Sequence, residues 1–327
     1  MSAVIHLATI QFLENHEINR SDLQEEVKAG LLSTTATIPS KLFYDLLGSK
    51  IFEVITHVPE YYLTSKEAEI LRNNLNDIAH EVGKHTTLID LGAGNCKKAA
   101  GLFKSLEPKS YVAVDISVDF LKDILPDLQT QFPTIEMMGV GTDFSSKLDL
   151  PLSVDQNNRV FFYPGSSLGN FNDEQAAILL KQIFSETHGG GLLLGLDLWK
   201  DERTLKLAYD DPLNITAAFN LNVLRNVNAL IGSDFAIEDF THHIEINTTF
   251  QRVEMHLEVQ KDITINWPNQ TRSFKKGERI HTENSQKYTL DKIKSLLSCA
   301  GFEHLKIWTD ADQYFAVIYA HSNSRPN

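Results

Sequence analysis

Short apolar runs alternate with amphipathic stretches along the middle of the chain, beginning near residue 86. The apolar runs end in glycine or aspartate, as buried strands often do, and the stretches between them carry apolar residues at helical spacing. Strands that alternate with helices indicate a mostly parallel sheet covered on both faces, because each parallel return needs a crossover. The predicted strands are 86–92, 110–117, 135–144, 158–167 and 189–199, and the predicted helices are 97–106, 118–132 and 173–187.

The alternation stops after Trp199. Residues 203–231 have a helical pattern, and residues 242–267 then alternate apolar and polar positions without an intervening helix, which predicts antiparallel strands. A helical pattern over 289–301 and two strand-like runs within 304–321 return to the first type of pattern. We expect these last elements to complete the parallel sheet with a hairpin.

The pattern therefore predicts an α/β protein in two parts, which suits a length of 327 residues. A Rossmann-like core, a mostly parallel sheet with a C-terminal antiparallel hairpin, would comprise residues 63–198 and 287–322. A discontinuous α+β substrate-binding domain would comprise residues 1–62 and 199–286. The sequence thus predicts that the substrate-binding part is inserted into the core.

A helix is also predicted over residues 63–82, ahead of the first core strand. Thr64 has the side chain of a helix cap, and Glu67 follows it at the spacing of a capping box. We expect both residues to have this structural role.

Composition and charge restrict the class of partner. The formal net charge is −13, which disfavours nucleic acid because phosphate binding relies on basic patches. No apolar run approaches the roughly 20 residues of a membrane helix, and the N-terminus lacks the basic region of a signal peptide. Cys96 and Cys299 show no metal-ligand spacing. We expect a cytoplasmic monomer that binds a small molecule and no nucleic acid, membrane or metal.

The first predicted core strand ends in a glycine turn, "LIDLGAGNCKK". Gly92 and Gly94 allow a ligand to approach the backbone, but Lys97 stands where a dinucleotide fingerprint has its third glycine. Asp115 ends the second strand, where a carboxylate can bind ribose hydroxyls, and Asp143 with Phe144 follows the third. Each residue alone is equally typical of an ordinary turn. Together they favour an adenosine ligand without a pyrophosphate, such as S-adenosylmethionine.

Two further stretches contain candidate binding residues. "FFYPGSSLGNF" ends the fourth strand, where Gly165 allows a close backbone turn and Asn170 offers both a donor and an acceptor. In "HTENSQKY", Glu283 and Ser285 are two residues apart and so share one face of an extended segment. Without further context, the first stretch is equally typical of an ordinary Gly-Asn turn, and the second is more typical of a solvated loop than of a binding site.

Several motifs, taken in order, resemble the histidine-specific S-adenosylmethionine-dependent methyltransferases, which include the L-histidine Nα-methyltransferases that make hercynine for ergothioneine. These motifs are "KLFYDLLGSKIFEVITHVPEYYLTSKEAEIL", "LIDLGAGNCKK", "YPGSSLGNF", "AYDDPLNITAAFNLNVLRNVN", "RVEMHL" and "HTENSQKY". The resemblance extends from about Leu31 to Tyr319. It implies a class I methyltransferase core.

The resemblance also implies a role for each matching residue. Contacts to S-adenosylmethionine would come from Tyr44, Phe52, Gly92, Lys98, Asp115, Asp143, Phe144, Gly165 and Ser166. Contacts to the amino acid would come from Tyr61, Asn170 and Tyr209 at its α-amino and carboxylate groups, and from Glu283, Ser285 and Met255 at its imidazole. The residues nearest the reaction would be Tyr44, Tyr61 and Asn170. Leu63, Ala93 and Tyr163-Pro164 depart from the family pattern and bear on local geometry.

The expected activity is trimethylation of the α-amino group of L-histidine. One alternative is an Nα-methyltransferase of another aromatic amino acid or a small amine, whose donor site would look the same. Another is a non-catalytic module that binds S-adenosylmethionine and needs neither Glu283 nor Tyr209. A dehydrogenase is disfavoured by Lys97.

Overall fold

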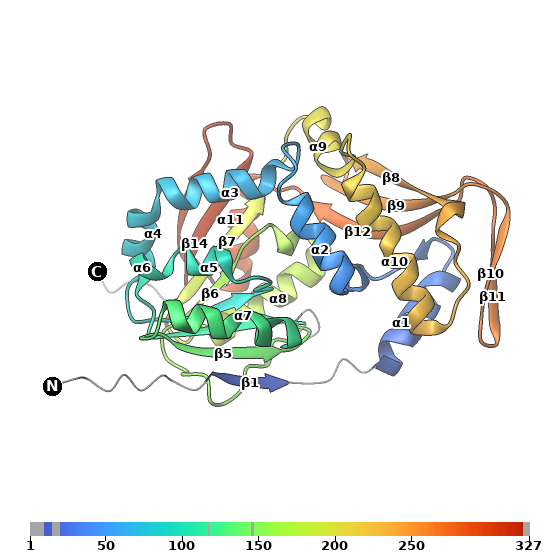
Figure 1. Ribbon diagram of the computed structural model, residues 1–327. Coiled ribbons are helices and arrows are strands. Elements are labelled where there is room, and N and C mark those ends of the chain that lie inside the picture. Colours follow the sequence, from blue (N-terminus) through green and yellow to red (C-terminus); the bar gives the residue numbers. More distant parts are fainter. Residues whose placement is uncertain (1–9, 15–19, 117, 145–146, 323–327) are drawn as a thin grey trace.

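The computed structural model describes residues 10–14, 20–116, 118–144 and 147–322. Its larger sheet has eight strands in the order β1-β5-β4-β3-β6-β7-β14-β13 (Figure 1). The pairs from β1 to β7 are parallel, and β14 and β13 are added antiparallel at one edge. The predicted Rossmann-like core, a mostly parallel sheet with a C-terminal hairpin, is therefore confirmed.

The strands of this sheet are short, and most are buried on both faces, as expected of a parallel sheet. They are β1 (Gln11–Glu14), β3 (Thr87–Leu91), β4 (Ser110–Asp115), β5 (Glu136–Gly141), β6 (Arg159–Tyr163), β7 (Gly191–Asp197), β13 (Glu303–Thr309) and β14 (Phe315–His321). The helices around the sheet are α3 (Tyr62–Asn73), α4 (Leu75–Val82), α5 (Lys97–Ala100), α6 (Phe103–Leu106), α7 (Val118–Gln131), α8 (Asp173–Glu186) and α11 (Leu290–Ala300).

Two groups of helices cover the two faces of the large sheet. Alternate residues of β3 belong to different apolar clusters: Leu88 packs with residues of α4, α6 and α7, whereas Ile89 packs with α8 and α11. This alternation follows from the pleat, which turns successive side chains to opposite faces. Both faces of the core are therefore closed to solvent.

The second part of the protein is built on a four-stranded sheet in the order β2-β12-β9-β8. Its strands are β2 (Ala36–Thr37), β8 (Phe240–Asn247), β9 (Arg252–Val259) and β12 (Arg279–Gln286), and a separate hairpin consists of β10 (Ile263–Trp267) and β11 (Gln270–Phe274). The helices of this part are α1 (Arg20–Leu32), η1 (Ser40–Phe43), α2 (Leu46–Ile55), α9 (Glu202–Tyr209), α10 (Ile215–Ile231) and η3 (Ile237–Asp239), and η2 (Ser167–Asn170) lies between β6 and α8. The antiparallel strands predicted over 242–267 are confirmed.

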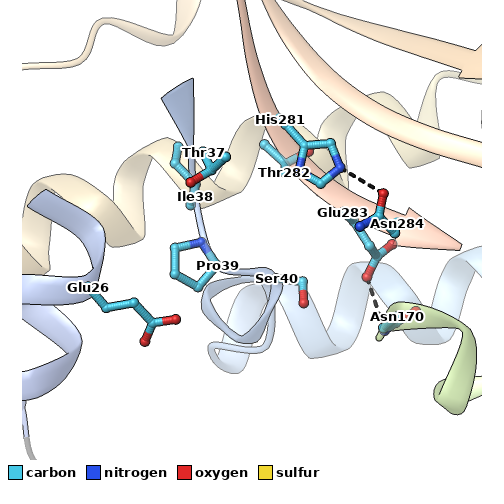
Figure 2. A pocket seen from close by; sticks show the side chains of 10 residues that line it. All are labelled: Glu26, Thr37, Ile38, Pro39, Ser40, Asn170, His281, Thr282, Glu283 and Asn284. Atoms are coloured by element: carbon cyan, nitrogen blue, oxygen red, sulfur yellow. Dashed lines mark hydrogen bonds between the residues drawn. The ribbon is translucent and has the colours of Figure 1, made fainter. Parts of the chain in front are cut away.

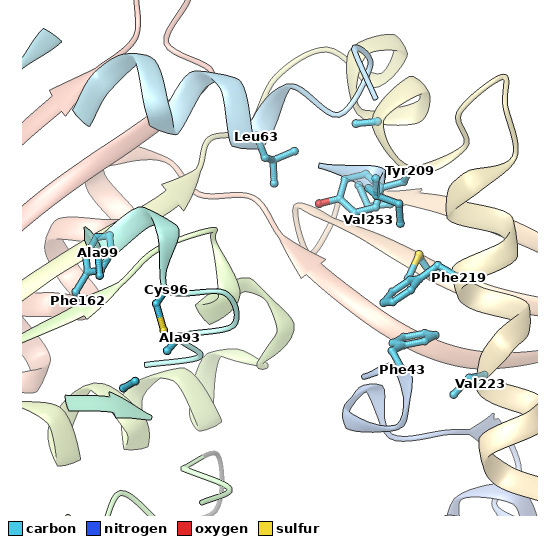
Figure 3. Packing of buried hydrophobic residues seen from close by; sticks show 14 of the residues in the cluster. Phe43, Leu63, Ala93, Cys96, Ala99, Phe162, Tyr209, Phe219, Val223 and Val253 are labelled. Atoms are coloured by element: carbon cyan, nitrogen blue, oxygen red, sulfur yellow. The ribbon is translucent and has the colours of Figure 1, made fainter. Parts of the chain in front are cut away.

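One apolar cluster joins the two parts. It includes Leu63 and Ala93 beside the large sheet, and Phe219 and Val253 from α10 and β9 (Figure 3). A continuous core of this kind fixes the two parts against each other. Residues from both parts can therefore line one site.

Three local expectations differ from the structure. The strand β1 lies within residues 1–62 but pairs with β5 at the edge of the large sheet. The helix expected over 63–82 is divided at Asn74 into α3 and α4. The helix expected over 203–231 is divided because the Asp211 carboxylate accepts the backbone N–H groups of Leu213, Ile215 and Thr216, at 2.8–3.1 Å. These bonds replace helical ones and start α10 afresh.

Among the described residues, no helix has the length and apolar character needed to span a bilayer.

Candidate active site

The glycine turn after β3 has the conformation that a ligand-binding loop needs. Gly92 and Gly94 have φ of 69° and 50°, in the left-handed region that favours glycine. The N–H of Gly94 donates to Asp115 Oδ2 at 2.9 Å, so the end of β4 holds the turn that follows β3. Apart from the residues next to it in the chain, no described residue has an atom within 4 Å of the position that a Cβ on Gly92 would occupy, so a ligand can approach this backbone closely.

Glu67 has a different role from the one that the sequence predicts. α3 begins at Tyr62 and has no side-chain cap, so the predicted capping box of Thr64 and Glu67 is wrong. The Glu67 carboxylate is buried and accepts the N–H of Gly165 at 2.8 Å and the Nζ of Lys98 at 2.5 Å. It therefore joins the turn after β6 to the helix after the glycine loop. The sequence gives little signal for this role, because a glutamate at a helix start is common.

Three further residues predicted to contact S-adenosylmethionine, Asp143, Phe144 and Ser166, follow the ends of β5 and β6. Asp143 follows β5 and lies 3.5 Å from the Lys41 Nζ, while the ring of Phe144 packs edge-on against Tyr163. The Ser166 hydroxyl accepts the N–H of Asp197 at 3.0 Å, so this side chain fixes the turn after β6 to β7.

Aromatic side chains form a connected series between the two parts of the protein. Tyr44 and Tyr61 both lie edge-on to Phe52, and Tyr61 lies edge-on to Tyr209, with ring centroids 5.8–6.3 Å apart. Phe219 of α10 packs against both Tyr44 and Phe52, with centroids 5.8 Å from each. The sequence predicts the first four residues for the site but not Phe219, although it occurs in the motif "AYDDPLNITAAFN".

Desolvation raises the pKa of Tyr44, Tyr61 and Tyr209 well above the usual value, and nearby carboxylates and tyrosines raise it further. These hydroxyls therefore remain protonated near neutral pH. They can orient a ligand by hydrogen bonds, but they are poor bases.

A bulge in β12 determines which way Glu283 and Ser285 point. Ile280 pairs with Leu257 and His281 with His256, but the register then shifts so that Glu283 pairs with Met255. Simple alternation would put Glu283 on the face of His281. The extra residue, Thr282, reverses the alternation, and Glu283 and Ser285 then share the inner face with Met255.

The bulge is held by hydrogen bonds from α10. The Thr282 hydroxyl lies 2.8 Å from Asn220 Oδ1 and 3.0 Å from the Met255 carbonyl. The Asn220 amide nitrogen donates to the His256 carbonyl at 2.9 Å and to His242 Nδ1 at 2.8 Å. Asn220 is fully buried, so these hydrogen bonds replace the ones that its amide group would otherwise make with water.

Glu283 faces Asn170 across the junction of the two parts. The Asn170 amide nitrogen donates to Glu283 Oε1 at 3.3 Å, and both residues line a pocket that is also bordered by β2 and η1 (Figure 2). Burial raises the pKa of the Glu283 carboxyl to about 8, although the charge of Lys287 opposes the shift. Met255 lies beside it on β9 and is 2% exposed. The structure thus brings the predicted imidazole-binding residues together.

A buried network lies behind Ser285. Its hydroxyl and that of Tyr209 are 2.7 Å apart, and the Lys287 Nζ lies 2.8 Å from each of them. The same nitrogen lies 2.7 Å from Asp197 Oδ2 at the end of β7. Asp197 also pairs with Lys200 at 2.5 Å and accepts from the Tyr62 hydroxyl at 2.8 Å.

The two lysines of this network share one carboxylate. Burial lowers the pKa of Lys287 and brings that of Lys200 to about 8, while Asp197 opposes both shifts. Neither lysine nor Asp197 is among the residues predicted for the site. Lys287 is in the quoted stretch "HTENSQKY", but a lysine in a polar segment usually lies in solvent.

Comparisons with known proteins identify relatives along nearly the whole chain. A family model described as "Histidine-specific methyltransferase, SAM-dependent" matches residues 23–322. Histidine N-alpha-methyltransferase of Mycobacterium tuberculosis is 33% identical over 306 residues, which cover 91% of this chain and 94% of the relative. N-methyltransferase dtpB of Aspergillus flavus is 28% identical over 327 residues, with coverages of 94% and 91%.

Ergothioneine biosynthesis protein 1 of Neurospora crassa is 30% identical over 300 residues, which cover 87% of this chain and 33% of that protein. The family match covers the glycine loop with its strand-end acids and the segment of β12 that contains Glu283 and Ser285. The chain therefore belongs to the histidine-specific, S-adenosylmethionine-dependent methyltransferases.

Proposed function

We propose that this protein trimethylates the α-amino group of L-histidine to hercynine, with S-adenosylmethionine as the methyl donor. The observation that carries the proposal is the pair Glu283 and Ser285, which the bulge turns inward. A neutral imidazole has one N–H donor and one acceptor nitrogen. Burial keeps Glu283 protonated to about pH 8 in the unliganded protein. In its ionised form the carboxylate can accept the N–H in a charge-assisted bond, and the Ser285 hydroxyl can serve the other nitrogen.

The donor would lie at the carboxyl ends of β3 to β6. Gly92 gives backbone access, Asp115 would accept the ribose hydroxyls, and Asp143 with Phe144 would contact the adenine. Lys98 and Gly165, joined through Glu67, would border the same space. The left-handed glycines and the open space above Gly92 fit a ligand that lies directly on the backbone.

When bound, S-adenosylmethionine supplies an electrophilic methyl group on a cationic sulfonium. The chain has to present the amine as a neutral nucleophile in line with that group, and positioning of this kind contributes about 7–11 kcal/mol in well-oriented reactions. Tyr61, Asn170 and Tyr209 are placed to orient the amine and carboxylate. The nearby sulfonium charge favours loss of the ammonium proton, so a weak acceptor such as water suffices. Tyr44, whose hydroxyl stays protonated, could pass a proton on but would not store it.

Three successive transfers require a site that tolerates an amine with fewer and fewer N–H groups. The aromatic series of Tyr44, Phe52, Tyr61 and Tyr209 meets this need. Aromatic faces attract quaternary ammonium groups without hydrogen bonds. The contacts to the imidazole ring stay the same in all three transfers, so they would hold the substrate in place while the α-amino nitrogen gains methyl groups.

The test is incubation of the protein with isotopically labelled S-adenosylmethionine and each of the twenty amino acids, with products identified by mass. The proposal expects histidine to gain three methyl groups. Preferred methylation of tryptophan, tyrosine or a small amine would replace the substrate assignment, and the 28% identity to a relative named only as an N-methyltransferase makes this comparison necessary. Donor binding without any turnover would indicate a binding module.

A further inference from the structure

The hydrogens around Ser285 can be counted. A lysine ammonium has three donors and no acceptor. Lys287 directs these donors at Asp197 Oδ2, Tyr209 Oη and Ser285 Oγ, at 2.7, 2.8 and 2.8 Å. Each hydroxyl oxygen therefore accepts one hydrogen from Lys287. Burial lowers the pKa of Lys287, but the adjacent Asp197 carboxylate opposes this shift and favours the charged form on which the count depends.

The two hydroxyls bring two hydrogens of their own. One of these hydrogens occupies the 2.7 Å bond between Tyr209 and Ser285. The second hydrogen cannot point at Lys287, which has no lone pair to offer. It has to point away from the lysine, and when Tyr209 donates in the bond between the two hydroxyls it belongs to Ser285, which shares the inner face of β12 with Glu283.

We propose that Lys287 makes the hydroxyl pair of Ser285 and Tyr209 a hydrogen-bond donor toward the substrate, and thereby selects a ring with an acceptor nitrogen at that position. This inference rests on the proposed binding of imidazole between Glu283 and Ser285. It assigns the two ring nitrogens: the one that faces Ser285 is unprotonated, and the other carries the hydrogen that Glu283 accepts. Lys287 acts through Ser285 and Tyr209, so it is a positioning residue that determines specificity.

Lys200 provides a matched control. It is also a buried lysine on Asp197, at 2.5 Å, but its other partners are the Tyr62 hydroxyl and the Leu198 carbonyl. No bond from it to Ser285 or Tyr209 is found in the described part of the chain. When either lysine is replaced, the other still pairs with Asp197, so this carboxylate is not left without a partner.

The experiment compares three substrates in the wild-type protein and in Lys287→Met and Lys200→Met. L-Histidine has both ring groups. β-(Pyrrol-3-yl)-L-alanine keeps an N–H at the remote (Nε2) position but has no acceptor at the near (Nδ1) position, and β-(thiazol-4-yl)-L-alanine keeps the near acceptor but has no remote N–H. Values of kcat and KM are measured for each substrate, and affinity for S-adenosylmethionine is measured by calorimetry without amino acid. Lys287→Gln is a second variant, whose polar side chain of similar length includes an amide oxygen that can accept a hydroxyl hydrogen.

The wild type should prefer histidine to the pyrrole analogue in kcat/KM by about 10- to 100-fold, because the analogue leaves a buried hydroxyl hydrogen unpaired. In Lys287→Gln that hydrogen can turn inward to the amide oxygen, and in Lys287→Met the lysine donors no longer force it outward, so the preference should fall to about threefold or less. We expect the change mainly in KM, with donor affinity retained. Lys200→Met should keep the wild-type preference, and all variants should still discriminate against the thiazole analogue through Glu283.

An unchanged preference in both Lys287 variants would overturn the inference, as would an equal loss of preference in Lys200→Met. These outcomes are distinct from failure of the proposed function. If the wild type binds S-adenosylmethionine but methylates no histidine, the substrate assignment itself is wrong, and so is the inference that rests on it.

Discussion

Replacing Glu283 by glutamine should stabilise the protein, and the gain should depend on pH. Burial raises the pKa of this carboxyl from 4.5 to about 8. The unfolded chain therefore loses its proton from about pH 4.5 upward, whereas the folded protein keeps it until about pH 8. Stability falls through this window and levels off above it, because the unfolded state binds fewer protons. Glutamine has nearly the same shape and does not titrate.

The size of the effect follows from the shift. A difference of about 3.5 pKa units corresponds to about 5 kcal/mol, at 1.36 kcal/mol per unit. Glu283→Gln should therefore be more stable than the wild type by up to about 5 kcal/mol at pH 8.5, and by little at pH 4.5. The same variant should lose affinity for histidine, because a neutral amide replaces the carboxyl group that we propose accepts the ring N–H when it is ionised.

Chemical denaturation of the unliganded protein between pH 4.5 and 9 measures the difference, and a second glutamate supplies the control. Burial alone would raise the pKa of Glu254, but the Arg252 guanidinium at 2.7 Å brings it below the usual value. Glu254→Gln should accordingly be less stable than the wild type across this pH range, which is the opposite sign, and the difference should vary little because the shift lies below about pH 4.5. A pH-independent difference for Glu283→Gln, or equal signs in the two variants, would refute the reasoning.

Three further changes test the framework around the site. Thr282→Val removes the hydroxyl that lies 2.8 Å from buried Asn220 Oδ1, so it should cost about 1–3 kcal/mol in urea denaturation and raise the KM for histidine without changing donor affinity, whereas an unchanged KM would mean that the bulge does not need this bond. Glu67→Ala leaves the Gly165 N–H without its acceptor and should weaken S-adenosylmethionine binding by about 10- to 100-fold in calorimetry; wild-type affinity would show that Glu67 is only structural. Gly195→Ala would place a Cβ 2.0 Å from Glu67 Oε1 and should destabilise the fold by about 1–3 kcal/mol with the same loss of donor affinity, and a neutral result would contradict the packing described for Glu67.

The sequence was informative where local pattern decides the structure. The alternation of strands and helices predicts the parallel core, because periodicity records which faces are buried. Two of the strand-end residues, Asp115 and Asp143, could be placed near a ligand for the same reason, since parallel strands end at one edge. Their contacts to a donor stay predictions, as do the domain boundaries.

Long-range contacts were not predictable from the pattern. Glu67 looks like a capping residue, but its partners are Gly165 and Lys98, which are distant in sequence. The sequence suggests that Lys287 lies in solvent, but its charge is paired with that of Asp197 at the end of another strand. In both cases a charged side chain is buried because tertiary partners satisfy it, and those partners leave no trace in local periodicity.

The bulge at Thr282 has a consequence for how this protein tolerates change in chain length. Downstream of the bulge, the Lys287 N–H donates to the Gln251 carbonyl and the Tyr288 N–H donates to the Asp197 carbonyl at the end of β7. These bonds fix the register of β12 relative to the large sheet, and with it the orientation of Glu283 and Ser285. Upstream of the bulge, the register of β12 follows from the turn after β11. The two registers differ by one residue, and the bulge accommodates this difference. Insertions or deletions upstream of the bulge should therefore leave the inward orientation of Glu283 and Ser285, the pair proposed to bind the substrate, unchanged.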